Sequence, residues 1–189
     1  MRIVGGKFKG WRLSAPPSHS TRPTTDRARE AIFNILSHGL HLKFDGIAAL
    51  DLFSGTGALG FEALSRGAES VLFVENETSA INCIKSNGIR IGETKIFSIR
   101  CEDASCLSAR TRREKSASLA FLDPPFGKKL ISPTLFALDS GDWLQVGAVI
   151  VVEMARDEYF ELIPPFSLKS ERHYGNAKFA FLSYGVDDS

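Results

Sequence analysis

The stretch ALDLFSGTGALG, residues 49–60, carries three glycines with the spacing GxGxxG. Glycines at this spacing permit a tight turn and let a ligand approach the backbone, but the pattern is informative only between a strand and a helix. Here an apolar run leads into the glycines, and a helical pattern begins at residue 57. The stretch therefore predicts a nucleotide-type binding loop in an α/β fold, with a loop that only turns the chain as the alternative.

The alternation of strand and helix patterns continues beyond this loop. Short, continuously apolar runs separated by helical periodicity are typical of a mostly parallel sheet that is covered by helices on both faces. The C-terminal part differs, because two strand patterns flank the turn dipeptide Gly175-Asn176 and predict a hairpin with an antiparallel strand. The expected strands are 47–53, 70–75, 95–100, 119–123, 148–153, 168–174 and 178–184, and the expected helices between them are 57–66, 78–87, 103–113 and 129–138.

The N-terminal part of the chain is basic and has a different pattern. Residues 2–14 alternate apolar and basic side chains around three glycines, which predicts a short hairpin or strand pair. After a proline-containing connector, a helix is expected from Thr24 or Thr25 to Gly39. The first 30 residues hold seven basic and two acidic side chains, whereas the whole chain has a net charge of +1. This asymmetry favours polyanion binding, although a solvated basic start gives the same pattern.

Length and composition are those of an ordinary soluble globular protein. The 189 residues are 43% hydrophobic and 24% charged, so we expect one domain, with a basic extension over residues 1–40 and a core over residues 41–189. No apolar run approaches the ~18 residues of a membrane helix, and the start is too polar for a signal peptide. Three cysteines without CxxC spacing argue against disulfides and a zinc site, and they fit a cytoplasmic location.

Acidic residues after the predicted strands indicate which ligand the glycine loop binds. Glu75 ends the second strand, 20 residues after Gly55, where an acid commonly binds ribose hydroxyls. Asp51 lies just before the glycines, where a carboxylate would repel a diphosphate but suits the amine and sulfonium of S-adenosylmethionine. Asp103 follows the third strand and can accept a hydrogen bond from an adenine amino group; a solvated turn or helix cap is the alternative. We therefore expect S-adenosylmethionine as the cofactor and no metal.

The stretch FLDPPFGKK, residues 121–129, ends a buried strand with a carboxylate, two prolines and an aromatic ring. The prolines restrict the backbone, so that Asp123 and Phe126 are held at a fixed separation. Asp123 and the carbonyl of Pro124 can accept the two hydrogens of an amino group, and Phe126 can stack on a planar base. We call residues 123–126 the hook and interpret it as the site of an acceptor amine.

The order of DLFSGTGALG, VLFVEN, EDA and DPPF resembles that of class I S-adenosylmethionine-dependent methyltransferases that modify amines. With RPTTDRAREAIFNIL and the opening IVGGKFKGWRL, nearly the whole chain resembles the bacterial 16S rRNA (guanine-N2)-methyltransferase family. The resemblance implies a seven-stranded Rossmann-like sheet with an antiparallel last strand, and methylation of a guanine in 16S rRNA. It implies a catalytic hook of Asp123, Pro124, Pro125 and Phe126, and cofactor contacts from Asp51, Phe53, Ser54, Gly55, Gly57, Gly60, Glu75, Asn76, Asp103 and Ala104. The basic side chains of the N-terminal extension and beside the hook are expected to contact RNA phosphates: Lys7, Lys9, Arg12, Arg22, Arg27 and Lys128.

One departure from the family pattern concerns Phe126, which stands where a tyrosine is frequent. The ring face is kept and the hydroxyl is lost, so stacking is expected to survive. The hook alone also fits DNA adenine N6 or a protein glutamine amide as acceptor. A nicotinamide-dependent oxidoreductase and a non-catalytic RNA-binding module are the rival functions. The sequence leaves open which nucleotide is modified, whether naked rRNA or a ribosomal particle is the substrate, and the oligomeric state.

Overall fold

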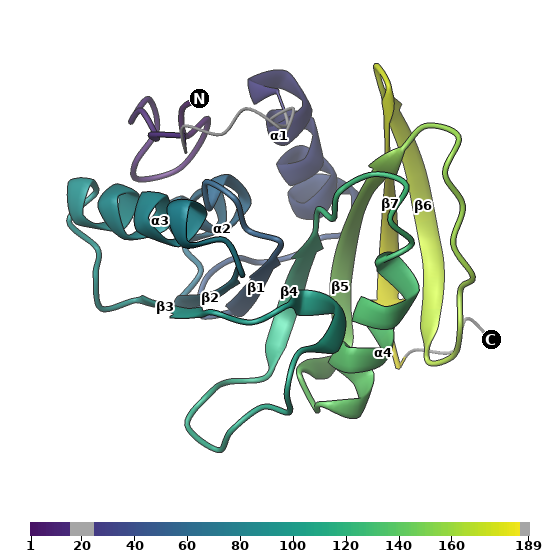
Figure 1. Cartoon of the computed structure of the whole chain (residues 1–189). Helices are drawn as coiled ribbons and strands as arrows, with labels where there is room; N and C mark the ends of the chain where they lie inside the picture. Colours follow the sequence, from purple (N-terminus) through teal and green to yellow (C-terminus); the bar gives the residue numbers. More distant parts are fainter. Residues whose placement is uncertain (16–24, 186–189) are drawn as a thin grey trace.

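The computed structural model describes residues 1–15 and 25–185 and has a seven-stranded sheet at its centre (Figure 1). The strand order is β3-β2-β1-β4-β5-β7-β6. Strands β1 to β5 run parallel, and β7 is antiparallel to both of its neighbours. The predicted fold class is thereby confirmed. The strands are β1 (Ala48–Leu52), β2 (Ser70–Val74), β3 (Phe97–Arg100), β4 (Ala117–Leu122), β5 (Leu144–Ala155), β6 (Phe166–Tyr174) and β7 (Ala177–Tyr184).

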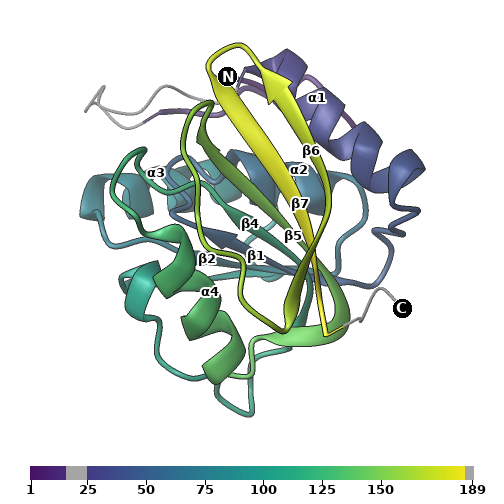
Figure 2. The ribbon, with the colours of Figure 1, turned by 90° about the vertical axis from the view of Figure 1, so that its right-hand side faces the viewer.

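Helices cover both faces of the sheet (Figures 1 and 2). On one face, Phe61, Phe73 and Phe121 belong to a core with α1, α2 and α3, and on the other, Leu50 and Trp143 belong to a core with α4. Burial on both faces explains why the central strands read as continuous apolar runs. The helices are α1 (Asp26–Asn34), α2 (Ala58–Ser65), α3 (Thr78–Arg90) and α4 (Ile131–Ser140).

Helix α1 begins where the sequence predicts. The Thr25 side chain accepts a hydrogen bond from the Ala28 amide and caps the helix, which satisfies one of the free amides of the first turn. A single π-helical turn, Ile35–Gly39, follows α1 directly and ends at the expected glycine.

The basic N-terminal segment is a small loop closed by a bridge between Arg2 and Arg12. It is held tightly to α2, because Val4 N donates to the buried Glu62 carboxylate at 2.7 Å and Phe8 N donates to Ser65 Oγ at 2.9 Å. A Cβ at Gly6 would overlap the Ser65 carbonyl. The predicted hairpin is therefore present as this short pair, and it is packed onto the body of the protein.

The helix predicted over residues 103–113 is wrong. Only Ala104–Cys106 forms a single 3₁₀ turn, and the chain then runs irregularly through residues 107–116 to β4. Asp103 caps the short turn by accepting hydrogen bonds from the amide and hydroxyl of Ser105. The helical spacing of apolar residues in this segment is therefore overridden by contacts that the local sequence does not show.

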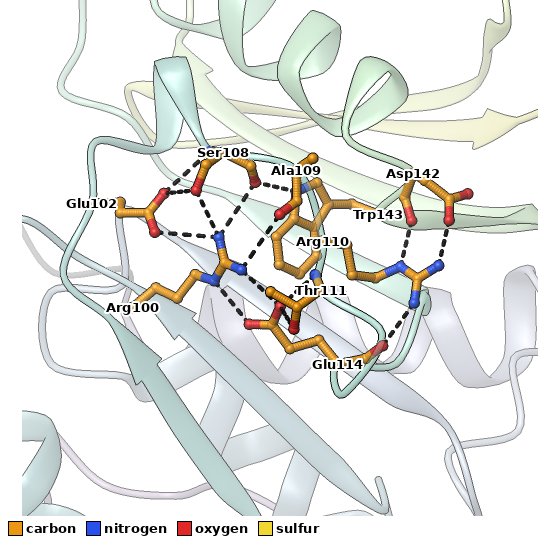
Figure 3. Close-up of polar contacts among 9 residues, drawn as sticks. All are labelled: Arg100, Glu102, Ser108, Ala109, Arg110, Thr111, Glu114, Asp142 and Trp143. Carbon is orange, nitrogen blue, oxygen red and sulfur yellow. Dashed lines mark hydrogen bonds and ion pairs between the residues drawn. The ribbon is translucent and has the colours of Figure 1, made fainter.

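Those contacts come mainly from two arginines (Figure 3). The Arg100 guanidinium lies over the ring of Trp143, 4.8 Å from its centroid, and donates to the Glu114 carboxylate at 2.7 Å. The other end of the segment is fixed by Arg110, which donates to the carbonyl and carboxylate of Asp142. Because a helix would carry these groups away from their partners, the network favours the extended loop. Further bonds involve Glu102, Ser108, Ala109 and Thr111.

Within residues 1–15 and 25–185, no helix has the length and apolar character needed to span a membrane.

Candidate active site

The predicted site residues meet at one edge of the sheet. The carboxyl ends of β1 to β5 lie at this edge, and the strand order reverses between β1 and β4. In open α/β sheets, ligands bind in the crevice at such a reversal. In the spatial order of their strands, the edge carries Asp103, Glu75, the glycine loop, Asp123 and Glu153.

The three glycines of the loop have different surroundings. Gly57 and Gly60 are buried, and a Cβ at either would press on the ring of Phe73. Gly55 has a φ of +53°, and a Cβ there would meet no atom within 4 Å. Two of the glycines are thus required by packing beneath the loop, and the third has open space where its side chain would be.

Glu75 holds the glycine loop to the end of β2. Its carboxylate accepts hydrogen bonds from Gly55 N at 2.8 Å and from the amides of Asn76 and Glu77, both at 2.9 Å. A carboxylate has about four acceptor positions, so Glu75 can still accept a bond from a ligand hydroxyl. Three backbone donors fix its orientation in advance.

Asp51 is buried beneath the loop and accepts a hydrogen bond from Gly60 N at 2.8 Å. Burial raises the pKa of Asp51 to about 8; the Gly60 hydrogen bond opposes this rise, and the nearby Glu75 carboxylate adds to it. The ionised form of Asp51 is therefore disfavoured by its surroundings, and a cation beside it would favour that form.

Two further predicted residues shape the turn after β1. Phe53 adopts a left-handed backbone conformation with a φ of +58°, which is strained for a residue with a side chain. The buried hydroxyl of Ser54 donates to the carbonyls of Asp51 and Val74 and so joins the ends of β1 and β2. This bonding keeps the glycine loop against the end of β2.

The hook directly follows β4. Asp123 N donates to the Leu52 carbonyl at 3.4 Å, Pro124 is buried, and the ring of Phe126 is 45% exposed. Burial raises the pKa of Asp123 well above its ordinary range, and the carboxyls of Glu153 and then Asp51 raise it further. The structure thus brings the acid of the hook into electrostatic contact with the acid of the glycine loop.

Glu153 is a member of this group that sequence reasoning missed. It is buried, and its strand pairs in parallel with β4, with Val152 opposite Leu122. Asp123 and Glu153 are the residues that follow Leu122 and Val152 along the chain. Because side chains alternate along a strand, Glu153 lies on the same face as Val151, which joins the core beneath α1 and α2. An acid that ends an apolar run offers no local signal of this role.

The loop after β5 is fastened to the hook by Glu158, which sequence reasoning also missed. Both carboxylate oxygens of Glu158 lie 3.2 Å from Gly127 N, and one accepts from Ala155 N at 3.3 Å. The segment that follows passes the start of α4, where Ser132 Oγ donates to the Glu161 carbonyl (Figure 2). The backbone on both sides of the hook is therefore braced.

The remaining predicted cofactor residues lie at the outer part of the edge. Asp103 is exposed, and its Oδ1 accepts both bonds from Ser105, which is the helix-cap arrangement that the sequence left as an alternative. Ala104 is buried beside it, and Asn76 is exposed after Glu75. The role of these three residues towards an adenosine stays a prediction.

The predicted RNA-binding residues are spread over three elements. Lys7 forms an ion pair with Glu93 at 2.7 Å, whereas Lys9 and Arg12 are exposed on the N-terminal loop. This loop lies next to the glycine loop, because Thr56 Oγ1 contacts Met1 Sδ at 3.4 Å. Exposed side chains also include Arg27 on α1 and Lys128 after the hook, and Arg22 lies outside the described residues.

Within the described ranges, no three histidine, cysteine or acidic side chains are arranged so that they could hold a metal ion.

The comparison with protein families matches residues 1–183 to the model described as conserved hypothetical protein 95. The chain belongs to this family. Its sequence is 32% identical to ribosomal RNA small subunit methyltransferase D of Escherichia coli, covering 95% of this chain and 87% of that protein. It is 38% identical to YlbH of Bacillus subtilis, a candidate rRNA methyltransferase, over 93% and 94% of the two chains.

A solved structure is similar to this chain over the same length. The structure of yhhF from Escherichia coli, a candidate methyltransferase, has 28% identity and a TM-score of 0.83, with 99% of both chains covered. The predicted family resemblance is thereby confirmed over nearly the whole length.

Proposed function

We propose that this protein is an rRNA methyltransferase that transfers a methyl group from S-adenosylmethionine to the exocyclic N2 amine of a guanine in 16S rRNA. The observation that carries this proposal is the position of the hook directly beside the glycine loop at the carboxyl edge of the sheet. A site for the acceptor amine and a site for the methyl donor would then adjoin each other, as methyl transfer requires. Family membership and the relatives named for small-subunit rRNA support the choice of acceptor.

The residues at the edge fit the methyl donor. Its ribose hydroxyls match the oriented Glu75 carboxylate, its adenine matches the Asp103–Ala104 turn, and its methionine end matches the open space beside Gly55. The Asp51 carboxyl helps to raise the pKa of Asp123, and the Glu75 carboxylate helps to raise that of Asp51; a positive charge beside these acids would favour their ionised forms. A sulfonium supplies such a charge together with an electrophilic methyl group, whereas a diphosphate would disfavour those forms.

The hook is suited to prepare the amine. The N2 lone pair of guanine is delocalised into the ring, so the amine is a poor nucleophile and depends on alignment at near-attack distance. Asp123 and the Pro124 carbonyl accept the two amino hydrogens and aim the lone pair, and Phe126 stacks on the base. As N2 bonds to the methyl carbon and the carbon–sulfur bond breaks, positive charge develops on N2. A fixed carboxylate at Asp123 stabilises that charge, and the proton then leaves to Asp123 or to solvent.

Access to the hook limits the substrate to an unpaired guanine. A base inside a helix cannot stack on a ring at a strand end, so the target is looped or flipped out. The side chains of Lys9, Arg12, Arg27 and Lys128 are exposed and are proposed to bind the phosphates of the flanking strand.

The direct test supplies the purified protein with radiolabelled S-adenosylmethionine and small ribosomal subunits from a strain that lacks the gene. The protein-free rRNA from those subunits is assayed in parallel. We expect nucleoside analysis to find N2-methylguanosine at one position, and no transfer to subunits from the parent strain, whose site is already modified. N6-methyladenosine, methylated protein, or no transfer to either substrate would contradict the proposal.

A further inference from the structure

A second exposed aromatic ring lies beside the hook. Tyr159, in the loop after β5, is 85% exposed, which makes it the most exposed of the large hydrophobic side chains in the described ranges. Such exposure leaves apolar surface of the ring in water, so a ring that is also held in place is a candidate contact for a planar ligand.

Tyr159 is held from below by a lysine. The Lys178 ammonium, at the start of β7, lies 4.4 Å from the centroid of the Tyr159 ring. Lys178 is itself buried, with 6% of its side chain exposed, and its ammonium lies 3.7 Å from Glu171. A buried cation under one face fixes the ring and leaves the opposite face open to solvent.

The ring is also close to the hook. Glu158, the residue before Tyr159, binds the amide of Gly127, the residue after Phe126. Through this bond, backbone and side-chain dimensions limit the distance between the Cα atoms of Phe126 and Tyr159 to at most about 14 Å. The two exposed rings therefore stand on adjoining loops that are bonded to each other.

We propose that Tyr159, backed by Lys178, is a second stacking platform that holds a base flanking the target guanine in the same RNA strand. The inference rests on the proposed function. Single-stranded RNA is held by aromatic rings on which successive unpaired bases stack, and such stacking tolerates any base because every base has a π face. Phe126 takes the guanine that is methylated, and Tyr159 holds the strand open beside it. The cationic Lys128 and Lys129 on the intervening loop match the phosphates between the two bases.

Kinetics separate this role from a structural one. Tyr159→Ala should raise the RNA concentration needed for half-maximal single-turnover rate by about 5- to 150-fold, with unchanged affinity for S-adenosylmethionine and an unchanged rate at saturating RNA. Tyr159→Phe keeps the ring and should behave like the wild type. Phe136→Ala removes another exposed ring, 63% exposed in the middle of α4, and should have no effect. A Tyr159→Ala protein with wild-type RNA dependence would overturn the inference, whereas failure of the wild type to methylate rRNA would overturn the proposed function instead.

Crosslinking identifies the partner directly. With p-azidophenylalanine in place of Tyr159, we expect irradiation of the complex with small subunits to crosslink the protein to rRNA at nucleotides flanking the methylated guanine. Crosslinks to a ribosomal protein would show that the ring contacts protein, and crosslinks to distant nucleotides would place it elsewhere on the RNA. Either result, or none at all, would overturn the assignment.

Discussion

The acids at the carboxyl edge of the sheet and the acids of the loop after β3 have opposite electrostatic surroundings. At the edge, burial and neighbouring carboxyls raise the pKa of Asp51 to about 8 and that of Asp123 well above its ordinary range. In the loop, desolvation of Glu114 is outweighed by hydrogen bonds from Arg100 and Thr111, which lower the pKa of Glu114 to about 2. The same functional group is thus destabilised as an anion in one region and stabilised in the other.

This difference agrees with the proposal that the edge binds a ligand, whereas the loop after β3 is structural. The Glu114 carboxylate accepts hydrogen bonds from an arginine and from local donors, so its ionised form stabilises the fold (Figure 3). Carboxyls whose ionised forms are disfavoured by burial and by neighbouring acids cluster at functional sites. A cation is the ligand that such a group lacks, which agrees with a sulfonium donor at the edge.

The largest expected effect at the edge follows from removal of the hook acid. Asp123→Ala should lower single-turnover methyl transfer by on the order of 10²–10³, the loss typical for one preorganised polar group at a developing charge, while the affinity for S-adenosylmethionine falls by much less. Asp123→Asn keeps one acceptor oxygen but not the charge, so its single-turnover rate should fall between those of the wild type and Asp123→Ala. Rapid-quench assays at saturating substrate measure this, and a wild-type rate in Asp123→Ala would show that the hook is not the acceptor site.

A smaller effect is expected at the ribose position. Glu75→Ala should weaken S-adenosylmethionine binding by ~1.5–3 kcal/mol, since hydrogen bonds to a charged acceptor have that size, and RNA binding should barely change. Glu75→Gln keeps one side-chain oxygen that can accept a hydrogen bond from a loop amide, so it should lose less of the affinity for S-adenosylmethionine. Comparison of the two variants separates a lost ligand contact from collapse of the loop. Calorimetry that finds wild-type affinity in a folded Glu75→Ala protein would remove Glu75 from the cofactor site.

In the structural loop, an acid substitution should affect stability in a pH-dependent way. Because the pKa of Glu114 is lowered from 4.5 to about 2 in the folded protein, its contribution is fully present above pH 4.5 and disappears as the pH falls towards 2. Glu114→Gln should therefore cost about 1–1.5 kcal/mol of unfolding free energy at neutral pH and progressively less in acid. Denaturant titrations across this range measure it, and a cost that does not depend on pH would refute the assigned cause.

The weakest expected effect concerns the basic N-terminal loop. Lys9→Ala and Arg12→Ala should each flatten the salt dependence of RNA affinity by about one unit of slope if each side chain binds a phosphate. Lys43→Ala, on an exposed position after α1, serves as the control. An unaltered slope in both variants would leave the loop with a packing role only.

The parts of the fold and site that the sequence predicts are those that short stretches determine. The glycine loop, Glu75 and the hook each combine a strand end with a distinctive residue, so their meeting at one edge follows from parallel pairing. The cap at Thr25 and the Gly175-Asn176 turn are local in the same way. The assignment of these residues to cofactor and base stays a prediction that the experiments above address.

What the sequence did not reveal depends on distant contacts. The loop after β3 is shaped by Arg100 and Trp143, which are 43 positions apart, and no helical pattern records that pairing. Glu153 joins the acids only through the register of β4 and β5, and Tyr159 comes close to the hook only through Glu158 and Gly127. The raised pKa of Asp51 likewise depends on its burial beneath the glycine loop.

The most direct test of the carboxyl edge as a cation site is the proton balance of cofactor binding. Titration calorimetry of S-adenosylmethionine near pH 7, repeated in buffers with different heats of ionisation, counts the protons exchanged. Because the cation favours the ionised carboxyls, we expect the wild type to release protons on binding, and Asp51→Asn and Asp123→Asn each to release fewer. No proton release by the wild type, or equal release by all three proteins, would contradict the assignment of these acids to the sulfonium.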